Sequence, residues 1–257
     1  MKMPLKISII TVVLNNKICI KDCIESISSQ TFGDIEHIVI DGGSTDGTVD
    51  IIKTCGNKIT RWVSEPDRGI YDAMNKGLAM ASGEVIGFLN ADDLYFDTDV
   101  LKTVASVMGD PKIDACYSDL IYVGRRDLKK VIRYWRSRPF EPGLFKRGWV
   151  PAHPTFFVRK KIYDQHGGFD LQYKLAADFE LMARFLEFHK IRALYIPRTL
   201  VKMRTGGATN KSIANIVKQN FEIVRACRKN DIKISPFSFL VRRFMARLHQ
   251  FSLKPAL

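Results

Sequence analysis

Short apolar runs alternate with helical patterns through the first 120 residues of the chain. Four runs are short enough to be buried strands, and they lie at 7–13, 36–41, 60–64 and 84–89. Between them, apolar residues recur at the spacing of three and four that marks an amphipathic helix, at 20–27, 49–55 and 70–81. This alternation predicts βαβ units and a mainly parallel sheet.

Beyond residue 121 the pattern becomes less regular. The candidate elements are an irregular stretch or β-hairpin at 125–147, an apolar run at 155–158, a helix at 176–189, a strand at 192–203 and helices at 212–228 and 237–251. In the helix at 176–189, the periodicity puts Leu181, Phe185 and Phe188 on the buried side. No low-complexity linker separates the two parts, so two lobes that share one core are favoured over two independent domains.

The charge of the chain is divided unevenly between these two parts. Residues 1–120 hold 11 Lys and Arg against 18 Asp and Glu, a net charge of −7, whereas residues 121–257 hold 29 against 9, a net charge of +20. A whole-molecule polyanion binder is therefore disfavoured. A nucleic-acid-binding protein is also disfavoured, because the sequence has no helix-turn-helix, zinc-finger or RNA-recognition signature. The basic half still suits phosphates or an anionic membrane.

The cysteines and the N-terminal residues indicate in which cellular compartment the protein is found. The five cysteines are scattered and lack CxxC spacing, which is typical of a reducing compartment. Lys2 and Lys6 precede an apolar run that imitates a signal peptide, but Asn15 and Asn16 end that run and no small-residue cleavage site follows. No apolar stretch approaches the roughly 20 residues that cross a bilayer. These features predict a cytoplasmic protein that contacts membranes only at its surface.

Polar residues follow each candidate strand of the first half. Asn15, Asp41 and Glu65 come after the first three strands, and Asp92 and Asp93 follow the fourth. The carboxyl ends of parallel strands share one edge of a sheet, where ligands bind. Two adjacent carboxylates at such an edge are costly unless they are solvated, paired or bound to a cation such as Mg²⁺ or Mn²⁺. A helix N-cap explains the same pair equally well.

Several motifs in a fixed order resemble one family. They are the strand from Ile7 to Asn15, IDGGSTDGT at 40–48, EPDRGIYDAMNKG at 65–77, GEVIGFLNADD at 83–93, His153-Pro154-Thr155, Gly168-Phe169-Asp170 and Asp178-Phe179-Glu180-Leu181. This ordered set resembles the family 2 glycosyltransferases of the GT-A fold. The resemblance implies an α/β fold, in which a Rossmann-like nucleotide-binding sheet is flanked by helices, with a smaller acceptor-side lobe and C-terminal helices.

The resemblance also implies a domain division and an activity. A catalytic domain at 1–204 would comprise a nucleotide-sugar-binding half at 1–95 and an acceptor-side half at 96–204, followed by a basic helical extension at 205–257. The enzyme would move a sugar, with inversion, from a nucleoside diphosphate sugar to a hydroxyl acceptor in polysaccharide or lipid-linked glycan assembly, with Mn²⁺ or Mg²⁺ as cofactor. The alternatives are a catalytically silent sugar-nucleotide-binding protein of the same fold and a nucleotidyltransferase.

Site residues follow from the resemblance position by position. Asp178 is the expected general base, and Glu180, about 200° away on the same helix, is the second choice. Asp92 and Asp93 are the expected metal ligands, with Asn90 where an Asp is common. The residues expected to bind substrate are Thr11, Asn15, Asp41, Asp67, Arg68, Asp72, Asn75, Asp92 and His153.

Some of these assignments have structural alternatives. Asp41 alternatively caps a turn, Arg68 and Asp72 alternatively belong to a helix surface, and His153 is alternatively structural. Gly42 stands where many members carry a second acidic residue, which leaves the identity of the nucleotide base open.

The end of the chain forms a basic amphipathic pattern. Residues 225–257 hold eight Lys and Arg against one Asp, and the apolar residues of 237–251 recur at helical spacing. Such a helix lies in the interface of an anionic membrane, packs on the catalytic lobe or pairs with another chain. The first of these predicts a lipid-linked acceptor, and the oligomeric state stays open.

Overall fold

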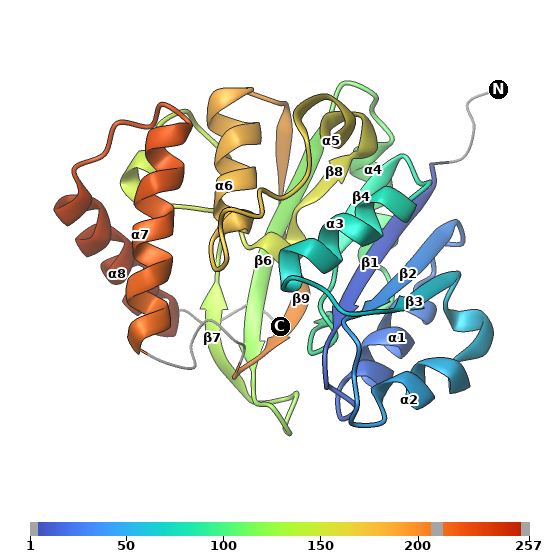
Figure 1. Ribbon diagram of the computed structural model, residues 1–257. Coiled ribbons are helices and arrows are strands. Elements are labelled where there is room, and N and C mark those ends of the chain that lie inside the picture. The colour runs from blue at the N-terminus through green and yellow to red at the C-terminus, as the bar shows by residue number, and fades with distance from the viewer. Residues whose placement is uncertain (1–4, 207–212, 253–257) are drawn as a thin grey trace.

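The computed structural model describes residues 5–206 and 213–252, and its centre is one twisted β-sheet with helices on both faces (Figure 1). Its first four strands, which are mutually parallel, are β1 (Ile7–Val13), β2 (Ile35–Asp41), β3 (Arg61–Ser64) and β4 (Val85–Phe88). Every residue of β1 is buried. A strand covered on both faces needs a continuous apolar run, which explains why β1, β2 and β4 were readable from the sequence, whereas β3 at the edge is mostly exposed.

The remaining strands make the sheet mixed. They are β5 (Leu94–Tyr95), β6 (Ala115–Val123), β7 (Val131–Trp135), β8 (Phe157–Arg159) and β9 (Ala193–Arg204). The order is β3-β2-β1-β4-β8-β6-β9-β5, with β7 paired to β6. β8 is antiparallel to both β4 and β6, and β6 and β7 form an antiparallel hairpin. Only β7 of this hairpin lies within the stretch expected at 125–147, and the strand β6 was not predicted. The parallel sheet predicted from the first 120 residues is confirmed for β1 to β4. In the second half β9 is parallel to β6, whereas β7 and β8 are antiparallel to it.

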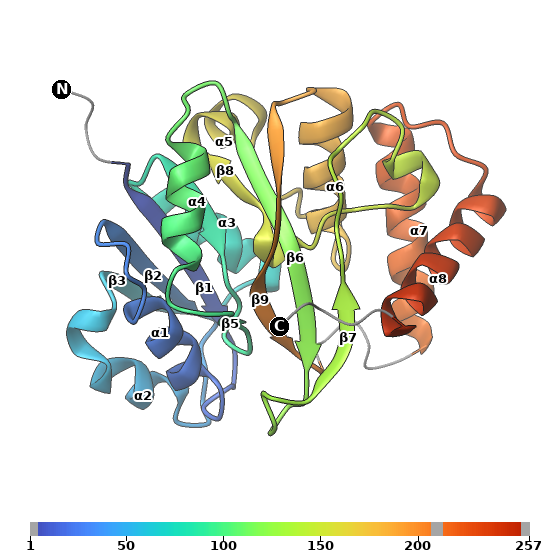
Figure 2. The same ribbon diagram turned by 180° about the vertical axis from the view of Figure 1, so that it is seen from behind.

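Helices cover the two faces of the sheet. They are α1 (Ile20–Ser28), α2 (Thr48–Thr54), α3 (Ile70–Met80), α4 (Val100–Met108), α5 (Lys160–His166), α6 (Ala177–Ala183), α7 (Ile213–Lys229) and α8 (Pro236–Ser252). α3 and α6 lie on the face seen in Figure 1, and α1 and α4 on the opposite face seen in Figure 2. None of the described helices is long and apolar enough to cross a membrane.

The helix expected at 176–189 changes character along its length. α6 ends at Ala183 and continues as a π-helical turn over Arg184–Phe188. Phe185 is buried as expected, but Phe188 is 49% exposed, so that part of the prediction is wrong. A π turn bonds residue i to residue i+5 and shifts the phase of the helix, which moves Phe188 out of the buried stripe. The expected start of the next helix at Ser212 lies outside the described residues.

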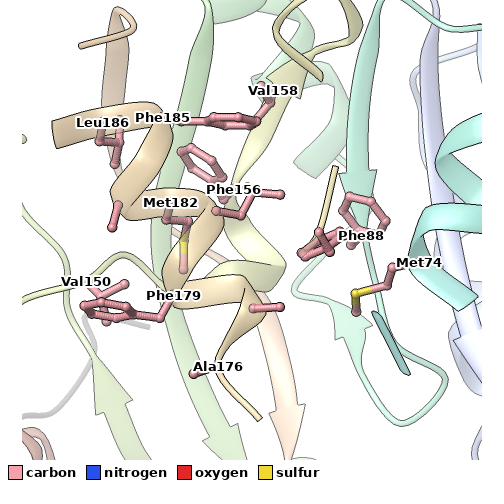
Figure 3. Close-up of a cluster of buried hydrophobic side chains, with 14 of the residues drawn as sticks. Met74, Phe88, Val150, Phe156, Val158, Ala176, Phe179, Met182, Phe185 and Leu186 are labelled. Carbon is pink, nitrogen blue, oxygen red and sulfur yellow. The ribbon is translucent and has the colours of Figure 1, made fainter. Parts of the chain in front are cut away.

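The principal core joins the two halves of the chain. Ile10 of β1 and Phe88 of β4 belong to the same buried cluster as Phe179 and Phe185. Figure 3 shows Met74 and Phe88 on one side of this cluster and the side chains of α6 on the other. The halves therefore share apolar packing, while the expected boundaries at residues 95 and 204 stay predictions. All five cysteines are free thiols, and four of them are buried.

The packing of α3 on β1 depends on a small residue. A Cβ at Gly77 would lie 2.4 Å from Ile10 Cγ2 and 3.3 Å from Ile40 Cγ1. We expect Gly77→Ala to lower the free energy of unfolding, because overpacking costs about 1 to 3 kcal/mol against a gain of about 1 kcal/mol in helix propensity. Urea denaturation measures the change. Gly33→Ala is the matched control, because no atom lies within 4 Å of a Cβ there, and equal effects at the two positions would contradict the packing argument.

Candidate active site

Asp41 ends β2 and organises the turn that follows. Its Oδ2 accepts hydrogen bonds from the Gly43 and Ser44 backbone N–H groups, at 3.1 and 2.9 Å, and from Ser64 Oγ at 2.7 Å. Gly43 has a φ of +86°, which glycine adopts without strain. Asp41 Oδ1 is also buried, yet it has no hydrogen-bond partner. One carboxylate oxygen thus caps the turn, as the structural alternative expected, and the other remains available to a donor group.

Asn15 and Thr11 of the first strand region differ in position. Asn15 is exposed, adopts a left-handed φ of 49°, and joins the loops after β1 and β2, because its Oδ1 accepts from the Thr45 N–H at 2.9 Å. Thr11 is fully buried, and its Oγ1 lies 3.0 Å from His37 Nε2. Asn15 therefore lies at the edge where the parallel strands end, whereas the Thr11 hydroxyl faces the interior.

The carboxylate of Asp67 lies against Gly42, where a larger residue would need the same space. A Cβ built on Gly42 would lie 2.3 Å from Asp67 Oδ2. The other oxygen, Asp67 Oδ1, accepts a hydrogen bond from the Gly69 N–H at 2.8 Å. The carboxylate of Asp67 is therefore held beside the backbone that follows Asp41. This contact was not predicted from the sequence, although the glycine at position 42 was its signal.

The other residues expected in the donor cleft are engaged with protein partners. Asp72 accepts from the Arg68 N–H at 3.0 Å and from Arg68 Nη2 at 3.1 Å, and these bonds lower the pKa of Asp72. The Arg68 side chain is mostly exposed. The Asn75 amide forms two hydrogen bonds with the backbone of Phe169, both at 2.8 Å. Arg68 and Asp72 thus form a pair at the start of α3, and Asn75 connects α3 to the segment before α6.

The turn after β4 gathers oxygen atoms without partners. Asp92 is half-buried, whereas Asp93 is fully buried with both carboxylate oxygens unpartnered, and the buried Asn90 Oδ1 is unpartnered too. Burial, and secondarily the charge of Asp92, raises the pKa of Asp93 well above its usual range. Unpartnered buried oxygens are costly, and Mg²⁺ and Mn²⁺ prefer oxygen ligands. These atoms fit a divalent cation.

A cation held here would need further ligands. In the described part of the chain, no three His, Cys, Asp or Glu side chains are grouped so as to hold a metal ion. Two carboxylates and one amide leave coordination positions for water or for the oxygens of a bound diphosphate. Arg204, which is 4% exposed, lies beside this turn and donates from Nη1 to the Asp92 carbonyl oxygen at 3.2 Å.

Asp178 opens α6 and contacts two side chains from other elements. Tyr71 Oη of α3 donates a hydrogen bond to Asp178 Oδ1 at 2.9 Å, and His153 Nδ1 lies 3.5 Å from Asp178 Oδ2. The Asp178 side chain is 25% exposed, so a ligand can reach it. His153 was expected near the site, whereas Tyr71 was not assigned a role, although it lies within the motif at 65–77.

The protonation states around Asp178 follow from burial. Burial lowers the pKa of His153 below its usual value, while the charges of Asp178 and Asp92 oppose that shift. Burial, together with Asp178, raises the pKa of Tyr71 well above 10. Both neighbours are therefore uncharged near neutral pH. A carboxylate with a hydrogen-bond donor on one oxygen and an imidazole near the other can accept a proton from a bound hydroxyl.

The two carboxylates of α6 have different surroundings. Glu180 is fully buried, and its Oε1 accepts from Arg184 Nε at 3.1 Å. Arg184 also donates to the carbonyl oxygens of Gly167 and Gly168, at 3.2 and 2.7 Å, which fixes the segment before α6. Glu180 thus has a structural role, and only Asp178 of this pair faces the cavity at the end of the sheet, which has a volume of about 230 Å³.

Comparison with known proteins gives a consistent set of relatives. The profile of the family described as Glycosyl transferase family 2 matches residues 8–167. A PGL/p-HBAD biosynthesis glycosyltransferase of Mycobacterium tuberculosis is 33% identical over 181 residues, which cover 69% of this chain and 68% of that protein. The putative glycosyltransferase EpsE of Bacillus subtilis is 25% identical over 252 residues, which cover 93% of this chain and 90% of EpsE.

Solved structures share the fold. S. aureus TarS 1–349 superposes with a TM-score of 0.70 at 21% identity, over 98% of this chain and 76% of TarS 1–349. The mannosyltransferase PcManGT of Pyrobaculum calidifontis, solved with GDP-Man and Mn²⁺, superposes with a TM-score of 0.67 at 20% identity, over 95% of this chain and 70% of PcManGT. The α/β arrangement of a GT-A glycosyltransferase is therefore that of this chain.

The contact between His153 and Asp178 can be tested by titration. Because the Asp178 carboxylate raises the pKa of His153 against the effect of burial, we expect Asp178→Asn to lower that pKa further. Imidazole ¹⁵N chemical shifts followed against pH measure the change. Tyr71→Phe is the control, since it keeps the carboxylate. An unchanged His153 titration in Asp178→Asn would show that the two groups are not in contact.

Proposed function

The chain belongs to glycosyl transferase family 2, and on that basis we propose that it transfers a glycosyl group from a nucleoside diphosphate sugar to an acceptor hydroxyl, with inversion at the anomeric carbon. The observation that carries this proposal is the partly exposed Asp178, flanked by Tyr71 and His153, on a cavity that is also lined by Arg204 beside the acidic turn. Related folds solved with UDP, with UDP-GlcNAc and with GDP-Man support a nucleotide-sugar donor.

The donor binds, in this proposal, where β1, β2 and β4 end. Asn15, Asp41 and Asp67 lie at this edge, and Asp41 Oδ1 is free to accept a hydrogen bond from a ribose hydroxyl or a base N–H. Arg68 extends from the same region toward solvent. Asp72 holds Arg68, whereas Thr11 contacts His37 and Asn75 bonds the Phe169 backbone.

Asp92, Asp93 and Asn90 would hold Mn²⁺ or Mg²⁺, in keeping with their unpartnered oxygens and with the Mn²⁺ of PcManGT. The ion stabilises negative charge on the departing diphosphate when it is bound.

The chemistry assigned to the chain's own residues is a single displacement. Asp178 takes the proton of the acceptor hydroxyl while that oxygen forms a bond to the anomeric carbon. The bond from this carbon to the nucleoside diphosphate breaks on the opposite face, and its electron pair leaves with the diphosphate. Tyr71 holds one oxygen of Asp178, and His153 borders the other. One displacement inverts the anomeric centre, and the buried, paired Glu180 supports a role for one carboxylate only.

The exposed apolar residues of α8 suggest that the enzyme acts at a membrane surface. Phe239 of α8 is buried, but six apolar residues of the helix are exposed, namely Phe237, Val241, Phe244, Met245, Leu248 and Phe251. An exposed apolar face next to arginines fits the interface of an anionic membrane. We therefore propose a peripheral enzyme of the cytoplasmic membrane face that builds a polysaccharide or a lipid-linked glycan.

Replacing the proposed base separates chemistry from binding. We expect Asp178→Asn to reduce sugar transfer by about 10² to 10⁴-fold, the usual contribution of a general base, while metal-dependent nucleotide binding persists. Calorimetry with UDP, GDP, dTDP and CMP, each with Mn²⁺, Mg²⁺ or chelator, identifies the donor class. Release of nucleoside diphosphate in the presence of a membrane extract then measures transfer.

Two further variants complete this test. Asp92→Ala should weaken the metal-dependent binding of the nucleotide, which Asp178→Asn leaves intact. Asp164 is a surface carboxylate paired with Lys160, so Asp164→Asn should change neither nucleotide binding nor sugar transfer. Transfer at the wild-type rate by Asp178→Asn would refute the assignment of the base. Nucleotide binding without transfer in the wild-type protein would favour a silent sugar-nucleotide-binding protein.

The membrane proposal predicts a preference for anionic lipid. We expect the full chain to sediment with vesicles containing phosphatidylglycerol and not with pure phosphatidylcholine. The double variant Phe237→Ser, Phe244→Ser should lose more than about tenfold in affinity, because each buried Phe contributes roughly 1.5 to 3 kcal/mol. Phe221→Ser on α7 is the control, since Phe221 is also highly exposed. Equal sedimentation with both lipids would exclude this mode of binding.

A further inference from the structure

Two neighbouring cavities, which share part of their walls, lie beside α8, and Asp178 lines the first of them. The first, of about 230 Å³, contains Asp178 and His153 in its wall. The second, of about 340 Å³, shares Arg133, Arg243 and Arg247 with the first and extends toward Arg136 and Arg138. We call the two cavities together the arginine trough. Among the described residues, its only carboxylate is that of Asp178, at one end.

Arg133 is held rigidly in the wall of the trough. It lies on β7 opposite Tyr122 of β6, and only 8% of its surface is exposed. Its guanidinium carbon lies 4.3 Å from the ring centre of Tyr122 and 5.3 Å from that of Trp135, and Nε donates to Gln250 Oε1 at 2.7 Å. The stacking fixes the guanidinium plane without neutralising its charge.

The arginines of α8 face the same space. A Cβ on Gly148, which has a φ of +82°, would lie 3.2 Å from the Arg243 backbone nitrogen, so α8 lies directly against this loop. Arg243 Nη1 is buried without a hydrogen-bond partner, and so is Trp149 Nε1 in the second cavity. Burial and the nearby charge of Arg247 lower the pKa of Arg243 to about 10, which still leaves it charged at neutral pH.

Three arginines of the trough lack an ion-pair partner among the described residues. In the described part of the chain, Arg133, Arg243 and Arg247 form no ion pair within 4.0 Å. By contrast, Arg184 and Arg204, which are also largely buried, each pair with a carboxylate. Buried charge without a partner is costly, and the cost is relieved when an anion binds. Arginine also suits phosphate, because its N–H groups can donate to two oxygens at once.

We propose that the arginine trough is the acceptor subsite and that it binds a phosphate or diphosphate group carried by the acceptor. This inference rests on the proposed glycosyl transfer for its meaning, because it places the acceptor's anionic group next to the base Asp178. The acceptor hydroxyl then lies at the Asp178 end of the trough and the phosphate toward α8. A lipid-linked phosphate and a phosphate on a soluble glycan share this chemistry.

Inorganic pyrophosphate tests the trough directly. Titrated by calorimetry into the full chain in the presence of chelator, it avoids the metal-dependent donor site. We expect it to bind the wild-type protein and to bind the double variant Arg243→Gln, Arg247→Gln more than about tenfold more weakly, because a charge-assisted hydrogen bond contributes roughly 1.5 to 3 kcal/mol. Arg242→Gln is the matched control, since this neighbouring arginine of α8 is exposed and lies outside both cavities.

Failure of the inference can be told apart from failure of the proposed function. Unchanged pyrophosphate binding in the double variant, or no binding by folded wild-type protein, would overturn the phosphate subsite. Metal-dependent nucleotide binding by the same samples reports separately on the donor site. Arg247→Gln alone provides a second test if the double variant does not fold, which circular dichroism would reveal.

Vesicles distinguish the two sources of phosphate. Phosphatidic acid presents a terminal phosphate, whereas phosphatidylglycerol carries negative charge without one. Competition with pyrophosphate by phosphatidic acid vesicles alone would support a lipid-borne acceptor phosphate. Pyrophosphate binding without competition from either vesicle would support the same subsite with a soluble phosphorylated acceptor.

Discussion

Two hydrogen bonds between the Asn75 amide and the backbone of Phe169 hold together the parts of the chain that form the site. Asn75 lies one turn after Tyr71 on α3, and Phe169 lies shortly before Asp178. The same connection is reinforced where Tyr71 and Phe169 stack with ring centres 5.5 Å apart. The short contact from Tyr71 to Asp178 therefore depends on a link between residues 94 positions apart. Asn75, which the sequence predicts to bind substrate, thus also links α3 to the segment that precedes Asp178.

The acidic and the basic half of the chain place their charged side chains in different parts of the fold. Its acidic half supplies Asp41, Asp92 and Asp93 at the carboxyl ends of parallel strands. Its basic half supplies the arginines that line the two cavities beside α8. Carboxylates without partners favour a cation, and guanidinium groups without partners favour an anion. The carboxylates without partners and the guanidinium groups without partners thus lie in different parts of the fold, and Asp178 shares a cavity with the guanidinium groups.

The hydrophobic pattern of the sequence predicted the elements whose formation depends on their own residues. The run at 7–13 matches β1 because a strand buried on both faces has no polar positions to obscure it. The exposure of Phe188 and the reversed direction of β8 could not be predicted, since a π turn and a strand's neighbours depend on tertiary packing. At the candidate site, the ordered motifs predicted roles for Asp178 and His153, and the structure places these two side chains 3.5 Å apart. Tyr71 and the arginine trough were not predicted, because they are defined by contacts between distant segments.

The approach of Asp67 to Gly42 couples two positions of the chain. The carboxylate of Asp67 occupies the volume that a Cβ at position 42 would require. A residue larger than glycine at position 42 would therefore have to displace this carboxylate, which would break its hydrogen bond to the Gly69 N–H. The effect of a substitution at position 42 would thus reach the backbone that precedes α3, and it would depend on which residue stands at position 67.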